Sequence, residues 1–189
     1  MNATFDLVAH RGLGGLTIRS VAERAGLSSG LVLFHFSSKG RLLHDVLDQL
    51  LQTTAVLHIG PEIAGIDDPL RRLVALLRQE MNRLTSDPKH IRAFFEFWIA
   101  GLKQPEIRAK MRQELARYRE AFRPMAEDVL AAEPVRFAGV SAEGLAAVSV
   151  SFIKGCAVQA MIDPKQFDIA QYLLAAEGLL AQLAPATGS

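Results

Sequence analysis

The stretch from Thr17 to Lys39 constrains the fold of this chain more than any other. Four apolar residues in it have the spacing of one face of a short helix: Ile18, Val21, Ala22 and Ala25. Thr17 precedes this helix as an N-cap, and Gly26 follows it as a left-handed C-cap. Ser28 then caps a second helix of about two turns. Two short helices joined by a turn that contains glycine are typical of a helix-turn-helix motif.

The second helix of this motif has an unusual distribution of side chains. Leu27, Val32 and Phe36 can face the first helix and form a small core with it. The outer face then consists of small polar, apolar and aromatic residues: Ser28, Ser29, Gly30, Leu31, Leu33, Phe34 and His35. Small residues allow a close approach to another surface, and exposed apolar groups can contact thymine methyl groups. The pattern indicates DNA binding, with a helical hairpin of no such function as the alternative.

The segment AERAGLSSGLVLFHFSSKGRLL resembles the DNA-binding signature of the TetR (tetracycline repressor) family of transcriptional regulators. The residues that match the family pattern are Ala25, Gly26, Leu27, Ser28, Gly30, His35, Phe36, Ser38, Lys39, Leu42 and Leu43. Ser29, Leu31 and Leu33 depart from it, because the family usually has Lys, Thr and Tyr at these positions. The resemblance implies an all-α protein whose second short helix enters the major groove of DNA.

Eight residues of the motif are the expected DNA contacts. They are Thr17, Ser28, Ser29, Gly30, Leu33, Phe34, His35 and Lys39. Lys39 is expected in the first turn of the next helix, behind a cap formed by Ser37 or Ser38. The resemblance assigns this lysine a contact to a phosphate, which positions the protein but does not read a base.

The rest of the chain is predicted to be helical, because no run alternates apolar and polar residues as a strand would. The expected helices cover approximately residues 2–11, 18–25, 28–36, 38–57, 69–84, 88–102, 105–131, 141–162 and 168–183. Pro124 is expected to kink or break the seventh of these helices. We therefore predict an all-α fold of about nine helices. A three-helix helix-turn-helix DNA-binding head, residues 1–48, precedes a larger ligand-binding and dimerisation body, residues 49–189.

Aromatic residues are concentrated in the middle of the chain. Phe94, Phe95, Phe97 and Trp98 are four of five consecutive residues of one helix, so they cannot all share one face. The segments FFEFWIAGLKQPEIRAKM and FIKGCAVQAMIDPKQFD are similar to the BetI-type ligand-binding domain, which implies a small-molecule effector such as choline. An aromatic cage suits a quaternary cation. We expect an effector site lined by Phe94, Phe95, Trp98, Tyr118, Phe122 and Phe152, with Glu80, Glu96 and Gln159 as possible polar anchors. Ordinary aromatic packing is the alternative.

Small residues are spread along the helix expected over 141–162, and a leucine stripe marks the helix that follows it. Small residues let helices approach closely. In the TetR family the last two helices of each subunit form a four-helix dimer interface, so the resemblance implies a homodimer that reads two half-sites. Packing within a single chain is the alternative explanation of this pattern.

Composition excludes several classes of protein. Charged residues make up 22% of the chain and the net charge is +1, which fits a soluble globular protein. Cys156 is the only cysteine, so an intrachain disulfide framework is excluded. We expect a cytoplasmic protein without a membrane segment, because no signal peptide is apparent and Lys154 and Gln159 interrupt the most apolar stretch. The five histidines show no metal-ligand spacing, and we expect no enzyme, no metal and no cofactor.

The leading hypothesis is a ligand-responsive TetR-family regulator that acts as a repressor. It would bind a pseudo-palindromic double-stranded DNA operator as a homodimer and be released by a small-molecule effector. The alternative is an all-α dimeric small-molecule-binding or interaction module that has lost its affinity for DNA. The short first helix and the nearly neutral head favour this alternative, whereas the intact stretch from Ser28 to Lys39 disfavours it.

Overall fold

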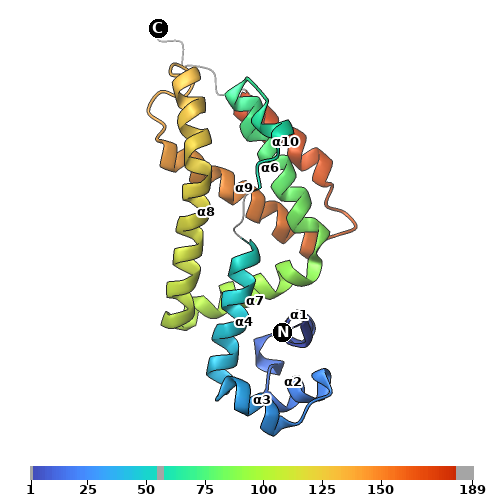
Figure 1. The fold of residues 1–189 in the computed structure, drawn as a ribbon. Helices are drawn as coiled ribbons and strands as arrows, with labels where there is room; N and C mark the ends of the chain where they lie inside the picture. Colours follow the sequence, from blue (N-terminus) through green and yellow to red (C-terminus); the bar gives the residue numbers. More distant parts are fainter. Residues whose placement is uncertain (1, 55–57, 182–189) are drawn as a thin grey trace. The chain divides into compact units, whose positions relative to one another are not determined.

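The computed structural model describes residues 2–54 and 58–181, and all the regular structure in these residues is helical (Figure 1). In chain order the helices are α1 (Asn2–Arg11), the 3-10 helix η1 (Leu13–Gly15), α2 (Ile18–Ala25), α3 (Ser29–Phe36), α4 (Lys39–Thr54), α5 (Pro61–Ala64), α6 (Pro69–Ser86), α7 (Pro88–Lys103), α8 (Pro105–Ala132), α9 (Ala142–Ile162) and α10 (Ile169–Ala181). The predicted all-α fold is confirmed. The expected helix ends at residues 57 and 183 lie outside the described residues.

Two local features differ from the sequence-based expectation. The segment 60–67 contains the short helix α5, because Gly60 has an extended backbone and Pro61 supplies the preset first helical residue. Helix α8 continues through Pro124. Proline removes the hydrogen bond to the carbonyl four residues earlier, here that of Glu120. Glu120 and Pro124 are both exposed, so this carbonyl loses its partner on a solvent-facing part of the helix.

The described chain divides into two compact units. The first combines α1 to α4 with α7 and the part of α8 up to Leu115, and the second combines α5, α6, the rest of α8, α9 and α10. The helix-turn-helix therefore shares its unit with segments distant in sequence. The expected domain boundary between residues 48 and 49 stays a prediction. The compact units are discontinuous in sequence, so they do not test where a domain made of one continuous segment would end.

The first unit has an apolar core that the head shares with α7 and the start of α8. Helix α7 packs against α1 and α4. The buried residues of this core are Leu7, Val8, Leu16, Val21, Ala22, Val32, Leu42, Val46, Leu47, Leu50, Leu51, Ala93, Phe94, Phe97, Ile107 and Met111. Removing such apolar surface from water is the main force that holds α7 against the head.

A polar contact also joins α7 to the segment that follows α1. The backbone N–H of Leu13 donates to Oε2 of Glu96 at 3.0 Å. Gly12 has φ +66°, and a Cβ placed on it would lie 2.9 Å from the same carboxylate oxygen. Any other residue at position 12 would therefore combine backbone strain with a steric clash. Glu96, which the sequence suggested as a possible polar anchor for a ligand, holds this glycine segment through that hydrogen bond, and its role toward a ligand stays a prediction.

In the second unit α9 is the central helix, with α6 and α10 packed against it. By length and composition alone α9 could cross a membrane. Its buried residues, which include Val150, Ile153 and Cys156, lie in the protein core. We therefore treat α9 as a core helix of this unit.

Candidate functional site

The two helices of the helix-turn-helix are defined by caps made within the motif itself. The N–H of Ser20 donates to Oγ1 of Thr17 at 3.0 Å, and the N–H of Thr17 donates to Oγ of Ser20 at 2.9 Å. Gly26 ends α2 in the left-handed conformation at φ 67°. The N–H of Leu31 donates to Oγ of Ser28 at 3.1 Å, which caps α3. The caps expected at Thr17, Gly26 and Ser28 are confirmed.

Helix α3 is anchored by Val32 and by the half-buried Phe36, and it exposes most of its other residues. Val32 is 2% exposed and lies in the core of the first unit. By contrast, Leu31 is 42% exposed, Leu33 44% and Phe34 81%. Leu27 was expected to face α2, but it is 46% exposed. It lies in the turn before the helix begins, where helical periodicity does not determine the direction of a side chain.

The start of α4 lies directly after α3 in the chain. The N–H of Arg41 donates to Oγ of Ser38 at 3.1 Å, so Ser38 is the cap, and Lys39 is the first helical residue. Lys39 is exposed and forms no ion pair with any residue that the structure describes. The Arg41 guanidinium, in contrast, lies 2.9 Å from the Asp45 carboxylate. Lys39 thus places an ammonium group beside an exposed helix N-terminus, where an anion is favoured.

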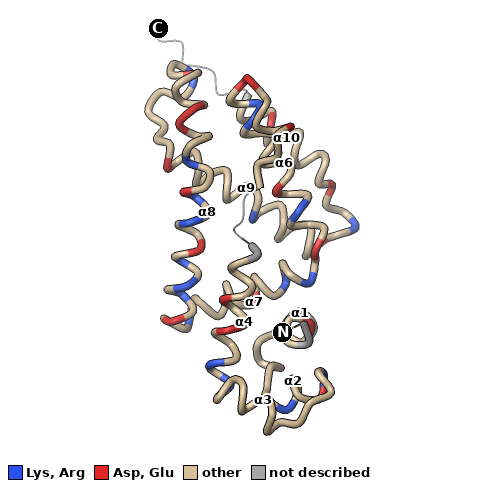
Figure 2. Tube along the Cα trace, viewed as in Figure 1, with Lys and Arg blue, Asp and Glu red and all other residues tan. Residues whose placement is uncertain are grey.

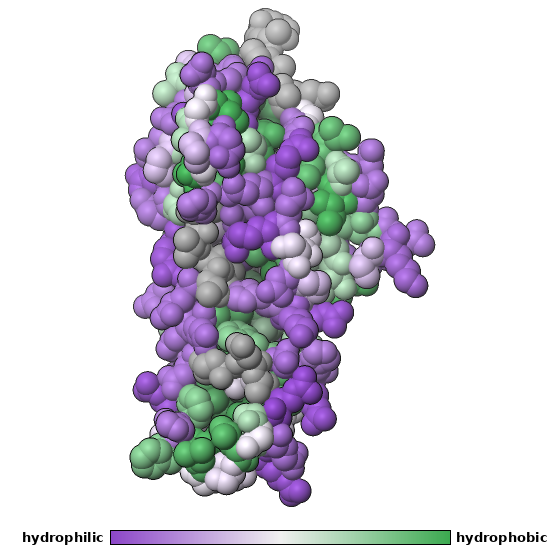
Figure 3. Space-filling model, turned by 45° about the vertical axis from the view of Figure 1, so that its right-hand side comes forward, coloured by the Kyte–Doolittle hydropathy of each residue, from purple (hydrophilic) through white to green (hydrophobic). Residues whose placement is uncertain are grey.

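The DNA-facing candidate surface contains very few charges. The sequence has no Lys, Arg, Asp or Glu between Arg24 and Lys39, and α3 carries neither colour in Figure 2. The side chain of Arg24 contacts Asp6 of α1 at 3.3 Å. The pKa of the Asp6 carboxyl is lowered by two hydrogen bonds, of which the one from Lys89 has the larger effect and the one from Arg24 the smaller. Figure 3 shows apolar side chains at the lower end of its view, the end at which Figure 1 places α3.

The eight expected DNA contacts are all exposed side chains or backbone positions. They are contributed by the cap of α2, by the N-cap and body of α3, and by the first residue of α4. They therefore occur in three consecutive short segments of the first unit.

The six aromatic residues expected to line an effector site are divided equally between the two units. In the first unit, Phe94 is 1% exposed, while Phe95 and Trp98 are half-buried and pack against the same core. The ring centroids of Phe94 and Trp98 are 5.6 Å apart. In the second unit, Tyr118 and Phe122 are buried and their ring centroids are 5.5 Å apart. Phe152 is half-buried.

A buried polar network surrounds Tyr118, and the sequence did not predict it as a unit. The Tyr118 hydroxyl donates to Oε2 of Glu80 at 2.8 Å, and Nη2 of Arg83 donates to the same oxygen at 2.6 Å. Glu80 has no exposed side-chain surface. Burial, reinforced by the Glu80 carboxylate, raises the pKa of Tyr118, so that this residue remains a neutral hydrogen-bond donor. The Lys154 ammonium lies 5.0 Å from the centre of the Tyr118 ring.

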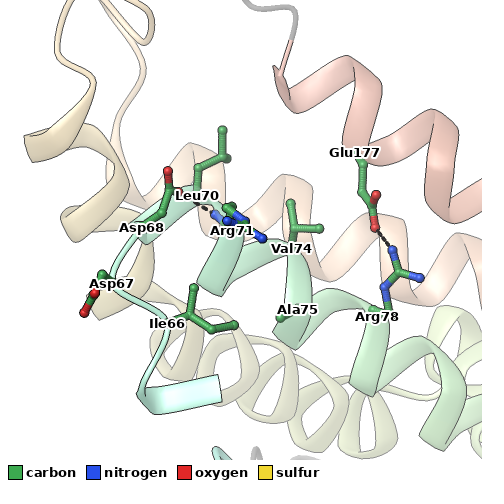
Figure 4. Close-up of a pocket in the computed structure, with 9 residues that line it drawn as sticks. All are labelled: Ile66, Asp67, Asp68, Leu70, Arg71, Val74, Ala75, Arg78 and Glu177. Atoms are coloured by element: carbon green, nitrogen blue, oxygen red, sulfur yellow. Dashed lines mark hydrogen bonds and ion pairs between the residues drawn. The ribbon is translucent and has the colours of Figure 1, made fainter. Parts of the chain in front are cut away.

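A groove between α6 and α10 is a second feature that the sequence did not reveal. It has a volume of about 720 Å³, which is in the range of small-molecule sites. The residues that line it are Ile66, Asp67, Asp68, Leu70, Arg71, Val74, Ala75, Arg78 and Glu177. Figure 4 shows Leu70 and Val74 directed toward the space between the two helices and the ion pair between Arg78 and Glu177 across it. The one hint of this groove in the sequence is that Leu70 and Val74 are four residues apart, which places them on the same face of a helix.

Helices α9 and α10 carry apolar side chains that the subunit leaves exposed. Val148 is 44% exposed, Ile162 73%, Leu174 56% and Leu179 62%. Leu179 belongs to the leucine stripe of the last helix, which was expected to face inward, so the predicted direction of this side chain was wrong. Gly155 is part of the contact between the two helices, because a Cβ placed on it would lie 3.4 Å from the Tyr172 hydroxyl.

Among the described residues, no group of three or more His, Cys, Asp or Glu side chains is arranged to hold a metal ion. Cys156 is fully buried, and this burial raises the pKa of its thiol to about 11. The thiol is therefore a poor nucleophile at neutral pH.

Comparison with known proteins decides the family. Residues 1–46 match the model of bacterial regulatory proteins of the tetR family. Residues 69–185, well over half of the chain, match the model of the C-terminal domain of BetI-type transcriptional repressors. The chain belongs to the TetR family. This family consists of transcriptional regulators and not of enzymes, and the alternative of an all-α dimeric small-molecule-binding or interaction module that has lost its affinity for DNA is not favoured.

Individual relatives agree with this assignment of the TetR-family chain. It is 29% identical over 107 residues to the HTH-type transcriptional regulator BetI of Stenotrophomonas maltophilia, and this match covers 57% of the chain and 55% of the relative. A transcriptional regulator from Rhodococcus sp. Rha1 is 25% identical, with a TM-score of 0.69 over 99% of this chain and 96% of that one. A Saccharomonospora viridis regulator solved in complex with choline is 18% identical, with a TM-score of 0.71 over 96% and 93% of the two chains. The last of these likenesses concerns the fold alone.

Proposed function

We propose that this TetR-family regulator is a cytoplasmic repressor that binds a pseudo-palindromic DNA operator as a homodimer and leaves it when a small molecule binds. The observation that carries the proposal is the geometry of the helix-turn-helix. Two capped helices meet at the left-handed Gly26, Val32 anchors the second helix, and the outer side of that helix is exposed. Recognition helices of this motif present their outer side to the major groove.

The proposed DNA contacts are the eight exposed residues already described: Thr17, Ser28, Ser29, Gly30, Leu33, Phe34, His35 and Lys39. The hydroxyls of Thr17 and Ser28 accept hydrogen bonds that cap the helices. The Ser28 hydroxyl hydrogen can still be donated, whereas the Thr17 hydroxyl donates to Oγ of Ser20 at 3.1 Å. Gly30 has no side chain, and a Cβ at this position would have only the Ser28 hydroxyl within 4 Å, at 3.9 Å. The helix can thus approach another surface closely at this point.

Homodimerisation is proposed through the exposed apolar residues of α9 and α10. A two-fold symmetric dimer presents two recognition helices to two half-sites, which a monomer cannot do. Covering Val148, Ile162 and Leu174 with a second subunit would remove from water the apolar surface that a single subunit leaves exposed. Gly155 supports this interface only indirectly, because it faces Tyr172 of the same chain.

The proposed effector contacts are Phe94, Phe95, Trp98, Tyr118, Phe122 and Phe152. Phe95, Trp98 and Phe152 retain accessible surface that a ligand can contact, whereas Phe94, Tyr118 and Phe122 are buried. The choline complex of the S. viridis regulator motivates choline as the first compound to test. A cation would have to avoid the ring face of Tyr118 near the Lys154 ammonium, because like charges repel.

The decisive experiment selects DNA fragments from a random pool with the purified full-length protein. We expect enrichment of an inverted repeat, and we expect the enriched fragment to bind the protein as a dimer. Adding choline should quench the fluorescence of Trp98, the only tryptophan in the sequence. Choline should also weaken DNA binding, and the factor should equal the one by which DNA weakens choline binding. A protein that enriches no sequence would instead support the module without DNA affinity. No catalytic activity is part of this proposal.

A further inference from the structure

We infer that this regulator recognises its operator mainly through thymine methyl groups, with Leu33 and Phe34 as the residues that determine specificity. The inference rests on the proposed DNA-binding function and adds the kind of base that the site reads. It follows from the chemical groups that the recognition helix has and from those that it lacks.

The recognition helix lacks the side chains that read bases by paired hydrogen bonds. Guanine is usually read by Arg or Lys, adenine by Asn or Gln, and cytosine by Asp or Glu. None of these six residue types occurs from Ala25 to Ser38. The polar side chains of α3 and its N-cap are only Ser28, Ser29 and His35. Bidentate recognition of any base by this helix is therefore impossible.

The exposed apolar side chains of the helix supply a different form of recognition. Each residue of an α-helix is rotated by about 100° from the one before it. The burial of Val32 therefore turns Leu33 to one side and Phe34 to the side opposite the core, in agreement with their exposed fractions of 44% and 81%. In the major groove the C5 methyl group of thymine is the apolar feature that distinguishes one base pair from the others.

The surroundings of these side chains favour DNA over a protein as the partner. Gly30 precedes Phe34 by one helical turn, and its missing side chain allows the helix to enter a groove. Lys39 at the start of α4 supplies an ammonium group and a helix N-terminus, which together suit a phosphate. An apolar protein partner would use the two apolar residues but would not require Lys39.

The test replaces thymine by deoxyuridine in the selected operator. This change removes one methyl group and leaves every hydrogen-bonding group of the base in place. Burying one methyl group contributes about 0.8 kcal/mol, which is about a fourfold change in Kd. A symmetric pair of contacts should therefore weaken binding about fifteenfold when both half-sites are changed. The measurement is anisotropy of labelled duplexes at one fixed salt concentration.

Variants identify which side chain makes each methyl contact. We expect Leu33→Ala or Phe34→Ala to weaken binding to the thymine duplex and to lose sensitivity to deoxyuridine at the position that the side chain contacts. Val135→Ala, which changes an apolar residue of the other unit that is 66% exposed and lies outside the proposed interfaces, serves as the control and should keep the full sensitivity. All three variants should fold, because the replaced side chains are exposed; circular dichroism checks this.

The possible failures separate the inference from the proposed function. Specific operator binding that is insensitive to deoxyuridine at every position would overturn the methyl inference and leave the DNA-binding proposal standing. A wild-type protein that selects no DNA sequence would overturn both. Variants that retain full DNA affinity but lose self-association would identify Leu33 and Phe34 as a protein contact, which also overturns the inference.

Discussion

Replacing Lys39 by alanine tests the proposed contact of this residue with a DNA phosphate. The residue is the first of α4, Ser38 caps the helix before it, and no described residue forms an ion pair with it. In the protein without DNA, a cation at an exposed helix N-terminus costs about 0.3–1 kcal/mol. A bound phosphate reverses this sign, because it meets the N–H groups and the ammonium together.

The magnitude follows from counterion release. Each phosphate contact contributes about 0.9 to the magnitude of the slope of log K against log salt concentration, so Lys39→Ala should lower it by about 1.8 for a dimer. Between 50 and 200 mM salt, the wild type should therefore lose about twelvefold more affinity than the variant does. The free energy of unfolding of the variant should be unchanged or higher by up to about 1 kcal/mol.

Fluorescence anisotropy of the operator and of a non-specific duplex, at four salt concentrations, measures both slopes. Lys165→Ala is a matched control, because Lys165 is also exposed but belongs to the other unit, and its loss changes the net charge equally. The control should leave the slope nearly unchanged. Unchanged affinity and slope in Lys39→Ala would remove this residue from the interface. If Lys39→Ala bound the operator more weakly but bound the non-specific duplex as the wild type does, Lys39 would contact a base, and its assignment to a phosphate would be refuted.

Three further predictions concern the second unit. Val148→Arg should give folded monomers, because Val148 is exposed in the single chain, and should lower the melting temperature only by the stabilisation that the dimer adds, whereas Gly155→Arg should also destabilise the fold of the single chain. Light scattering and thermal melts distinguish the two, and a monomeric wild type at micromolar concentration contradicts the dimer. Tyr118→Phe should lower the free energy of unfolding in urea by about 1.5–3 kcal/mol, because the buried Glu80 carboxylate loses a hydrogen bond; a loss near zero would show that the bond is not stabilising. Cys156 should resist a thiol reagent at pH 8 in the native protein and react fully in denaturant, since burial raises its pKa to about 11; rapid native labelling would contradict its burial.

The sequence predicted the helix-turn-helix in detail because its determinants are local. The caps at Thr17, Gly26 and Ser28 are each formed with residues no more than five positions away. Ser141 caps α9 in the same local way, so the predicted start of this helix lies within one residue of the observed one. Where periodicity does not apply, as for Leu27 in the turn, the predicted direction of the side chain was wrong.

The arrangement of the candidate effector residues could not be predicted in the same way. Phe94 and Tyr118 are both aromatic residues of middle helices, but they belong to different compact units. Glu80, Arg83 and Tyr118 form one buried network although 38 positions separate the first from the last. Sequence spacing along a helix carries no information about such long-range contacts, so it could not separate packing residues from ligand contacts.

The sharing of one core by the head and α7 has a consequence for the construction of chimeric regulators. A head cut from this chain after residue 48 would leave Leu7 and Val8 without Ala93, Phe94 and Phe97, the apolar partners that α7 supplies. Joining it to a foreign body would also replace the carboxylate that holds the N–H of Leu13. A DNA-binding head that is moved to another protein should therefore include residues 87–115 as well as the N-terminal segment. The transferred part is then discontinuous in sequence.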